Sequence, residues 1–225
     1  MITRPRETIS RGPFLLSVRY AHVLGTTGTF QHLCHIRALP GRVRMGEVTV
    51  IAELLEHRLI QSQRSDHAVR RQVEYRADCL LQHGACRVHA IDVGTNQLVW
   101  KLRQDPRVVV KEKFNARYMT PEDIGEQVDL IVSDVSFISL KKILPAAFSL
   151  LKEGGNALVL IKPQFELQPE DIGAGGIVRD PVLHRRAVDS IRTFVTEELG
   201  RSWMGCEPSP ITGTDGNHEF LAWLK

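Results

Sequence analysis

The last two-thirds of the sequence predict an α/β fold with a mostly parallel sheet. From residue 76 onward, short apolar runs alternate with helical patterns, which is typical of βα units. The final runs, WMGCEPSPI and HEFLAWLK, can pair as a terminal antiparallel hairpin at the sheet edge. Residues 1–75 keep neither a two-residue nor a 3.6-residue period for long, so this segment is expected to be irregular.

Composition restricts the class of protein. The 225 residues, 43% hydrophobic and 24% charged, suit one large globular domain with or without a small appendage. No apolar run approaches the roughly 18 residues of a membrane span, and no apolar stretch follows the basic start as in a secretory signal. The four cysteines form no CxxC pair. We therefore expect a cytoplasmic protein with reduced thiols and no membrane contact.

Basic charge is concentrated at the N-terminus. Residues 1–70 contain ten arginines, five acidic residues and no lysine, a net charge of +5 against +3 for the whole chain. An arginine-rich arm that contacts phosphates is one interpretation. Arginine-favouring base composition, or translation out of the ancestral frame, would give the same pattern. Only VTVIAELLEHRLI (Val48 to Ile60) resembles a strand followed by a helix.

The regular part begins with a short helix in RADCLLQHGA, which should end at Gly84. A strand in CRVHAIDVG ends in Asp92, a helix in QLVWKLRQ follows, and RVVVKEK is a second strand. Thr120 and Pro121 of TPED then have the residue types of an N-cap and a first helical turn. The buried strand VDLIVSDVSF leaves Asp134 at its carboxyl end.

The next helix, in SLKKILPAAFSLLKEGG, is expected to stop at Gly154 and Gly155, with Pro145 either kinking it or marking its start. The most apolar strand, NALVLIKPQFE, ends at Lys162, and the glycine-rich loop DIGAGGIVRDP follows. The last predicted helix has one apolar face, made of Leu183, Ala187, Val188, Ile191, Phe194, Val195 and Leu199.

Polar residues gather where open sheets of this kind bind ligands, at the carboxyl ends of the strands. Asp92 has the position of a carboxylate that binds a ribose diol, although a solvated strand-end acid gives the same signal. Asp134 follows four apolar residues, and a buried carboxylate needs a partner. Lys162 interrupts an apolar run, which indicates a paired or functional lysine, or else a charge that protects an edge strand.

Asp134, Lys162 and Glu219 could together orient and deprotonate a hydroxyl group. The lysine would have to lose its proton to act as a base, and nearby carboxylates oppose that loss. Part of its role is therefore expected to be positioning.

Several long collinear motifs resemble one known family. DVGTNQLVWKLRQDPRVVV, VDLIVSDVSFISLKKILPA, LIKPQFE, GGIVRDPVLHRR and PSPITGTDGNHEFLAWL are similar to the TlyA (haemolysin A) family, FtsJ-like RNA ribose methyltransferases. The likeness runs from about Asp78 to Lys225. It implies a Rossmann-like class I methyltransferase domain over 76–225 and S-adenosylmethionine as cofactor. It also implies 2′-O-methylation of ribosomal RNA (at cytidine in the family), with ribosomal RNA or a ribosomal subunit as partner.

The family's site residues carry over onto specific positions. Its catalytic aspartate, second lysine and glutamate match Asp134, Lys162 and Glu219. The resemblance places the cofactor among Asp92 and Val93 of the DVG motif, Asn115 and Asp134.

The sequence departs from the family in its first third. The glycine-rich motif LDIGASTGGFTD is replaced by AVRRQVEYRAD, and GTTGTF resembles it only faintly, some fifty residues too early. Ser10-Arg11-Gly12 continues without the family's first catalytic lysine, and no S4-type domain is recognisable in 1–75. The alternative is therefore an inactive or frameshifted family member that binds no cofactor and at most weakly binds RNA. The haemolysin name suggests a lytic protein, but the sequence shows no amphipathic or spanning segment.

Two further groups have competing interpretations. The spacing of His22, His32, Cys34 and His35 matches no standard zinc pattern, so no metal is expected. The GAGG loop (Gly173 to Gly176) could bind a phosphate but is better explained as a mobile substrate lid. Contacts with RNA phosphates, or a solvated helix face, would explain the arginines that follow it, Arg179, Arg185 and Arg186.

Overall fold

A computed structural model describes residues 18–23, 31–36, 47–53, 77–96, 98–213 and 216–225, the first three ranges as backbone only. The chain divides into two compact units, Met1–Val43 and Arg44–Lys225. Within the first unit, β1 (Val18–Val23) pairs antiparallel with β2 (Gln31–Ile36). His22 and His32 face each other in that register, but their side chains, like the GTTGTF stretch, lie outside the described part of the structure.

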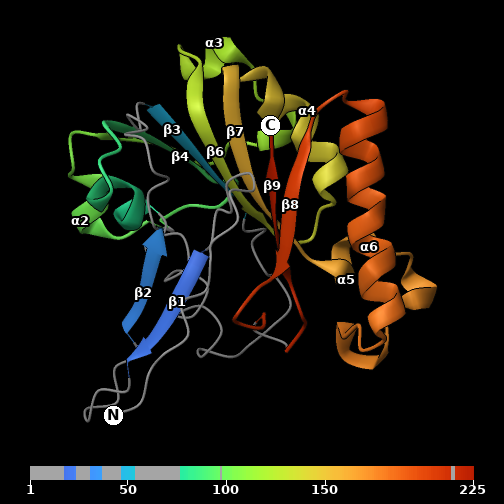
Figure 1. Ribbon diagram of the computed structural model, residues 1–225. Helices are drawn as coiled ribbons and strands as arrows, with labels where there is room; N and C mark the ends of the chain where they lie inside the picture. The colour runs from blue at the N-terminus through green and yellow to red at the C-terminus, as the bar shows by residue number, and fades with distance from the viewer. Residues whose placement is uncertain (1–17, 24–30, 37–46, 54–76, 97, 214–215) are drawn as a thin grey trace, which may run out of the picture. The chain divides into compact units, whose positions relative to one another are not determined.

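The second unit is built on a seven-stranded sheet in the order β5-β4-β3-β6-β7-β9-β8 (Figure 1). Five neighbouring strands are parallel, and β9 and β8 continue the sheet antiparallel. This arrangement confirms the predicted parallel sheet with a C-terminal hairpin. The strands are β3 (Glu47–Glu53), β4 (Arg87–Ile91), β5 (Val108–Lys111), β6 (Val128–Val135), β7 (Leu151–Ile161), β8 (Trp203–Pro208) and β9 (Phe220–Leu224).

Strand β3, the middle one of the five parallel strands, comes from the segment that was expected to be irregular. Val48 pairs with Val88 of β4 on one side and with Leu130 of β6 on the other. The strand half of the predicted strand-to-helix stretch Val48 to Ile60 is therefore present, and its remainder lies outside the described residues. The sheet thus begins before residue 76, where the regular fold was expected to start.

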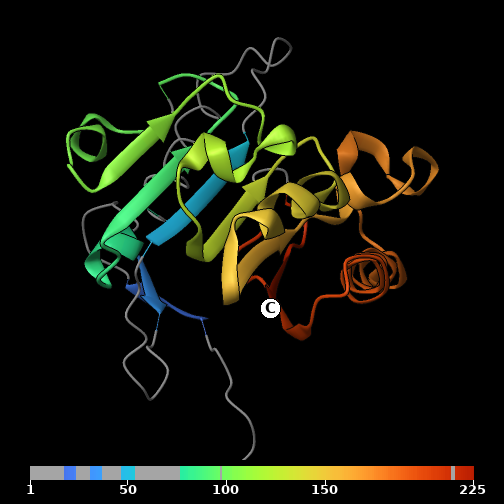
Figure 2. The same ribbon diagram turned by 90° about the horizontal axis from the view of Figure 1, so that it is seen from above.

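Short helices follow most strands (Figure 2). Helix α3 begins as predicted, with Thr120 as N-cap, Pro121 in the first turn and a capping box closed by Asp123. The helices are α2 (Trp100–Arg103), η1 (Ala116–Tyr118), α3 (Pro121–Ile124), α4 (Leu140–Ser149), α5 (Pro163–Glu166), η2 (Pro169–Asp171), η3 (Ala174–Gly176), α6 (Pro181–Thr193) and the π-helical η4 (Phe194–Glu198), besides helical backbone at 77–82.

The predicted end of the fourth helix was wrong. Helix α4 stops at Ser149 and encloses Pro145, while Gly154 and Gly155 already belong to β7. Leu151 pairs with Val128 and Asn156 with Leu130, so residues 152–155 bulge out opposite a single residue of β6. Gly154 has φ of +75°, which a glycine adopts without strain. The glycine pair thus shapes a bulge rather than a helix terminus.

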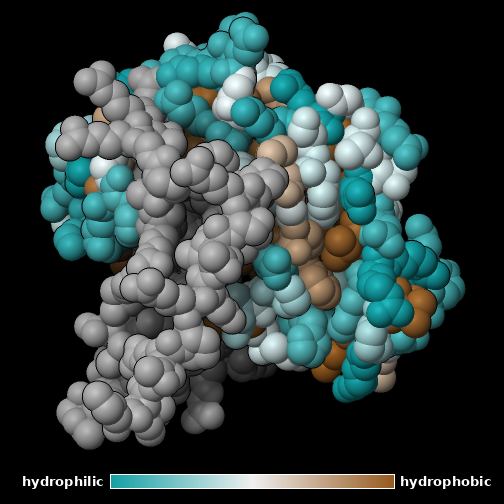
Figure 3. Space-filling model, in the orientation of Figure 1, coloured by the Kyte–Doolittle hydropathy of each residue, from teal (hydrophilic) through white to brown (hydrophobic). Residues whose placement is uncertain are grey.

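The core lies between the sheet and the helices α4 and α6, which both contact β7. The apolar face predicted for the last helix is confirmed over α6, η4 and Leu199, because all seven of its residues are buried or half-buried. Figure 3 shows mainly hydrophilic residues on one face, interrupted by small hydrophobic patches. Among the described residues, no helix is long and apolar enough to cross a membrane.

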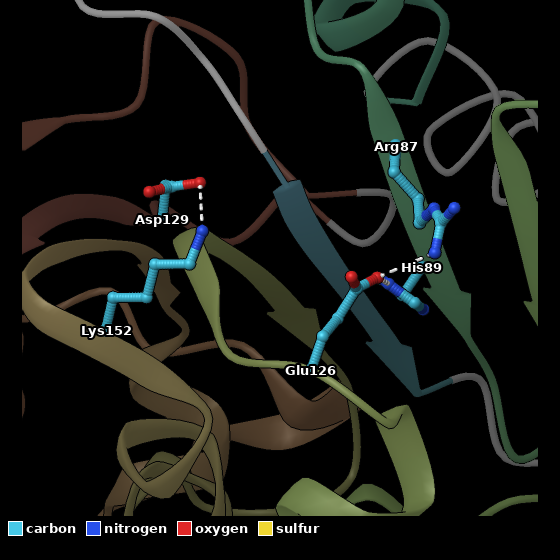
Figure 4. Close-up of polar contacts among 5 residues, drawn as sticks. All are labelled: Arg87, His89, Glu126, Asp129 and Lys152. Atoms are coloured by element: carbon cyan, nitrogen blue, oxygen red, sulfur yellow. Dashed lines mark hydrogen bonds and ion pairs between the residues drawn. The ribbon is translucent and has the colours of Figure 1, made fainter.

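Ion pairs fix the edge of the sheet opposite the candidate site (Figure 4). Glu126, just before β6, accepts from Arg87 (3.2 Å) and contacts the buried ring of His89 (2.6 Å), both on β4. Lys152 at the β7 bulge pairs with Asp129 of β6 at 3.0 Å. These contacts join strands at their amino-terminal ends and therefore have a structural role.

Candidate functional site

The sheet brings the predicted polar residues to one edge. Asp92 directly follows β4, Asp134 is the penultimate residue of β6, and Lys162 directly follows β7. Because β9 is antiparallel to β7, the start of β9 lies beside the end of β7, with Phe220 opposite Ile161. Glu219, one residue before β9, therefore reaches the same edge from the C-terminal hairpin.

Asp134, Lys162 and Glu219 form a buried cluster, each 8% exposed or less. Lys162 Nζ lies 2.7 Å from Asp134 Oδ1 and 4.0 Å from Glu219 Oε1. The ammonium group is thus in direct contact with one carboxylate and within reach of a second. This geometry agrees with a lysine that is paired rather than one that protects an edge strand, since β7 is an interior strand.

Ser136 belongs to the same cluster, although the sequence reading passed over it. Its Oγ accepts a hydrogen bond from Lys162 Nζ at 2.9 Å. Ser136 follows Asp134 by two residues, and side chains two apart on an extended chain share one side. This two-residue spacing is the sequence signal that could have placed Ser136 beside Asp134. Two of the three N–H groups of Lys162 are therefore directed to the end of β6 and to the residue that follows it.

The loops after β4 and β5 are joined where the cofactor was expected. Asp92 is 6% exposed, its Oδ1 accepts from Gly94 N at 2.7 Å, and its carbonyl accepts from Phe114 N at 3.1 Å. Val93 is half-buried beside it. Asn115 is exposed, and its Oδ1 caps η1 by accepting from Arg117 N. A buried carboxylate at a strand end, with an exposed amide nearby, fits the ribose and adenine parts of a nucleoside cofactor.

Sheet topology supports this placement. The strand order reverses between β3 and β6, and Ala52 of β3 pairs with Asp134 of β6 at that point. Ligands of open α/β sheets bind outside the carboxyl ends of strands at such a switch point. The segment that follows β3, at 54–76, lies outside the described residues, so the methionine end of the cofactor is not assigned to residues here.

The glycine-rich loop and the three candidate arginines lie around the start of α6. Gly175 and Gly176 both have positive φ, and residues 173–176 are exposed. Arg179, Arg185 and Arg186 are all exposed, and Arg186 also forms an ion pair with Asp171 of η2. Arg179 lies three residues after Gly176, whereas Arg185 and Arg186 belong to α6.

Two aromatic rings stand beside the cluster. Phe137, one residue after Ser136, has φ of +63° and is 50% exposed. Its ring centroid lies 5.1 Å from that of Phe165 on α5. A bulky side chain in the left-handed region is strained, and such strain is commonly found at functional sites.

Glu166 joins the two segments that carry the cluster. Its carboxylate accepts from Ser139 Oγ at 2.5 Å and from Leu140 N at 2.8 Å, at the start of α4. Burial raises the pKa of Glu166 to about 7, although the two hydrogen bonds and Lys141 oppose the shift. The loops after β6 and β7 are thereby held together below Asp134 and Lys162.

A parallel five-stranded core with an antiparallel hairpin, and acids at the ends of β4 and β6, defines a Rossmann-like methyltransferase fold. Residues 77–225 match the FtsJ-like methyltransferase family, and the chain belongs to that family.

Two curated relatives and one solved structure extend the comparison. The 16S/23S rRNA (cytidine-2′-O)-methyltransferase TlyA of Mycobacterium tuberculosis is 47% identical over 66% of this chain and 55% of its own. Bacillus subtilis YqxC, provisionally named an rRNA methyltransferase, is 50% identical over 65% of this chain and 52% of its own. A Lactococcus lactis structure, provisionally called a hemolysin, is 37% identical with TM-score 0.68, covering 81% of this chain and 79% of that one.

The chain therefore spans about half the length of the curated relatives that it matches. The resemblance to the TlyA family is confirmed for the C-terminal part. Among the residues that the structure describes, no group of three His, Cys, Asp or Glu side chains could hold a metal ion.

Proposed function

We propose that this chain methylates a ribose 2′-hydroxyl in ribosomal RNA, with S-adenosylmethionine as methyl donor. The observation that carries the proposal is the buried Asp134–Lys162–Glu219 cluster at the switch point of the sheet. The relatives named above supply the substrate class, cytidine in ribosomal RNA. The proposal assigns this chemistry to residues 76–225 together with strand β3, and no S4-type domain is recognisable in the sequence of the divergent basic segment 1–75. A cytoplasmic location follows from such a substrate.

The side chains of the cluster would orient the hydroxyl group. Lys162 gives one N–H to Asp134 and one to Ser136, so its third N–H can hold the ribose oxygen. Glu219 Oε1, 4.0 Å from Lys162 Nζ, can take the hydroxyl proton as the oxygen–carbon bond forms. S-adenosylmethionine supplies, when bound, a methyl group on a positively charged sulfonium. One ammonium and two carboxylates carry a net charge of −1, which favours a cation beside them.

Other residues would bind the rest of the two substrates. Asp92 would hold the cofactor ribose, with Val93 and Asn115 beside it. Arg179 and Arg185, exposed at the glycine-rich loop, would contact RNA phosphates, and Arg186 would do so less because Asp171 holds it. Phe137 offers an exposed ring on which an unstacked base can lie.

The test is a methyl-transfer assay on ribosomal subunits and on ribosomal RNA, with labelled S-adenosylmethionine and mass spectrometry of the nucleosides. We expect 2′-O-methylcytidine to form, and Lys162→Ala to lower the rate by about a thousandfold or more. Lys142→Ala is the matched control, because Lys142 is exposed on α4. A folded wild-type chain that transfers no methyl group, or a Lys162→Ala chain as active as the control, contradicts the proposal.

The alternative is a family member that no longer binds cofactor. It is favoured by one sequence observation, the absence of the glycine-rich first motif and the first catalytic lysine. Calorimetric titration with S-adenosylmethionine separates the two: one-site binding that Asp92→Ala abolishes supports the enzyme, and no binding by the folded chain supports the remnant.

A further inference from the structure

Asn217 is a deeply buried polar residue near the cluster and has no place in the proposed chemistry. It lies two residues before Glu219 and is 1% exposed. Its Oδ1 accepts from Val178 N at 2.9 Å, and its Nδ2 donates to Gly176 O at 3.0 Å. The Asn217 side chain thus binds one backbone N–H group and one backbone carbonyl group of the glycine-rich loop. A buried amide group is costly unless it is hydrogen-bonded, so these two bonds fix the glycine-rich loop to the segment before β9.

The backbone of Asn217 holds a second segment. Its carbonyl accepts from Gly213 N at 2.8 Å, which closes the turn that precedes β9. A Cβ atom at Gly213 would lie 2.7 Å from Glu219 Oε1, closer than side chains tolerate. The backbone of Gly213 therefore lies against the Glu219 carboxylate, and a Cβ atom there would displace this carboxylate.

Helix α6 holds the glycine-rich loop from its other side. His184 is buried, and its Nε2 lies 2.8 Å from Val178 O, so Nε2 carries the proton that this carbonyl accepts. The His184 ring also packs near His218 and Phe220, at centroid distances of 5.5 and 5.7 Å. These two residues flank Glu219 in the chain. The contacts of Asn217 and His184 thus meet at Val178.

We propose that Asn217 is a positioning residue, which sets the Glu219 carboxylate against Lys162 by fixing Gly213 and coupling both to the glycine-rich loop. The inference rests on the proposed function, since Glu219 is taken to receive the ribose hydroxyl proton. Its consequence is that any movement of the glycine-rich loop on RNA binding would also move Glu219. Displacement of a catalytic group by about 1 Å costs on the order of a hundredfold in rate.

The experiment compares two site variants with two matched controls. Asn217→Ala removes both side-chain hydrogen bonds, and Gly213→Ala pushes directly on Glu219 Oε1 without altering Asn217. Asn156→Ala removes the bond from Trp223 Nε1 (2.9 Å) at the far part of β9. Gly205→Ala adds a Cβ with no atom within 4 Å.

We expect Asn217→Ala and Gly213→Ala each to lower kcat by about tenfold to a hundredfold, with KM for S-adenosylmethionine within about twofold of wild type. The controls should retain wild-type kcat. Equal kcat in all four variants, or an equal loss in all four, overturns the inference. If Asn217→Ala does not fold, the comparison of Gly213→Ala with Gly205→Ala decides.

A second readout is independent of catalysis, so failure of the proposed function is distinguishable from failure of this inference. The ¹³C resonance of the Glu219 side-chain carboxyl should shift in Asn217→Ala and in Gly213→Ala, and stay unchanged in Asn156→Ala. An inactive wild type with these shifts rejects the enzyme but keeps the positioning role. An unmoved Glu219 resonance in both site variants rejects the positioning role.

Discussion

Lys162 is a buried cation whose partners come from two other segments. Asp134 and Ser136 lie within 2.9 Å of its Nζ, and Glu219 lies at 4.0 Å. The apolar run before Lys162 was enough to predict that it is paired or functional. The spacing of Asp134 and Ser136 was enough to place both on one side of an extended chain. The expectation that Asp134, Lys162 and Glu219 would meet depended on their predicted places at strand ends and on the family motifs, whereas the contact with Ser136 was not anticipated.

Replacement of Lys162 should also affect stability. Lys162→Met leaves Asp134 buried without its ammonium partner, which should lower the free energy of unfolding by roughly 3 kcal/mol. The double variant Lys162→Met/Asp134→Asn should recover most of this loss, because the uncompensated charge is gone. Urea denaturation of the three chains measures both effects. Lys142→Met, on the exposed side of α4, should change stability by less than about 0.5 kcal/mol. Equal losses in the single and double variants would show that the ion pair is not the cause.

At the scale of elements, helix α4 begins where two site segments meet. Ser139 caps it, and Glu166 from α5 accepts from both Ser139 Oγ and Leu140 N. The Glu166 carboxylate thus accepts hydrogen bonds from the first residues of α4 rather than from its own helix, α5. The sequence showed each helix but not this contact, because 26 and 27 residues separate the partners.

Glu166 gives the stability a specific pH dependence. Its pKa is raised from 4.5 to about 7, so the folded chain holds its proton over a range where the unfolded chain has lost it. The contribution of Glu166 to the free energy of unfolding is therefore largest below about pH 4.5 and is lost as the pH rises toward 7.

Glu166→Gln should remove the loss of stability with rising pH. At pH 8 the free energy of unfolding of the variant should therefore exceed that of wild type by on the order of 2 kcal/mol. Urea denaturation between pH 4.5 and 8 is the measurement. Glu170→Gln, at an exposed position in η2, should leave the wild-type pH profile in place. A Glu166→Gln profile parallel to that of wild type would contradict the assignment.

The bulge in β7 shows how tertiary packing overrides a local helix signal. Leu150 and Leu151 are buried, and their packing ends α4 at Ser149, six residues before Gly155. A Cβ atom at Gly155 would lie 2.9 Å from the backbone oxygen of Lys152. We expect Gly155→Ala to lower the free energy of unfolding by about 1–3 kcal/mol, measured by thermal or urea unfolding. Gly205→Ala, which meets no atom within 4 Å, should cost much less. Equal costs would show that the bulge can relax.

At the scale of the whole molecule, the formal net charge of +3 does not by itself indicate RNA binding. What matters is where exposed cations lie relative to the Asp134–Lys162–Glu219 cluster. Arg179 and Arg185 are exposed beside the glycine-rich loop that Asn217 ties to the segment of Glu219. Binding to phosphates through these residues would place RNA across the carboxyl edge of the sheet.

Arg185→Ala should weaken binding to ribosomal RNA and lower the slope of log K against log salt by about 0.7 to 1. Arg186→Ala should have a smaller effect, since Asp171 already holds that side chain. Binding titrations between 50 and 200 mM salt test this, with Arg201→Ala as control because its guanidinium lies over Phe148 at 5.0 Å. An unchanged slope for Arg185→Ala would place the RNA elsewhere.

The sequence by itself determined the parallel sheet from residue 76, the closing hairpin and the apolar face of α6. Each depends on local periodicity, which burial of one face imposes on any helix or strand. The family motifs added the roles that we propose for Asp92, Asp134, Lys162 and Glu219.

Only the tertiary structure decided which strand lies in the middle of the five parallel strands and which side chains surround the site. Strand β3 lies between β4 and β6, and their partner residues are 40 and 82 positions away in the chain, so no local pattern could specify the pairing. The same holds for the contacts of Glu166, Gly213 and Asn217. Hydrogen bonds between distant segments form only because the sheet brings their ends to one edge, and the site exists where those ends meet.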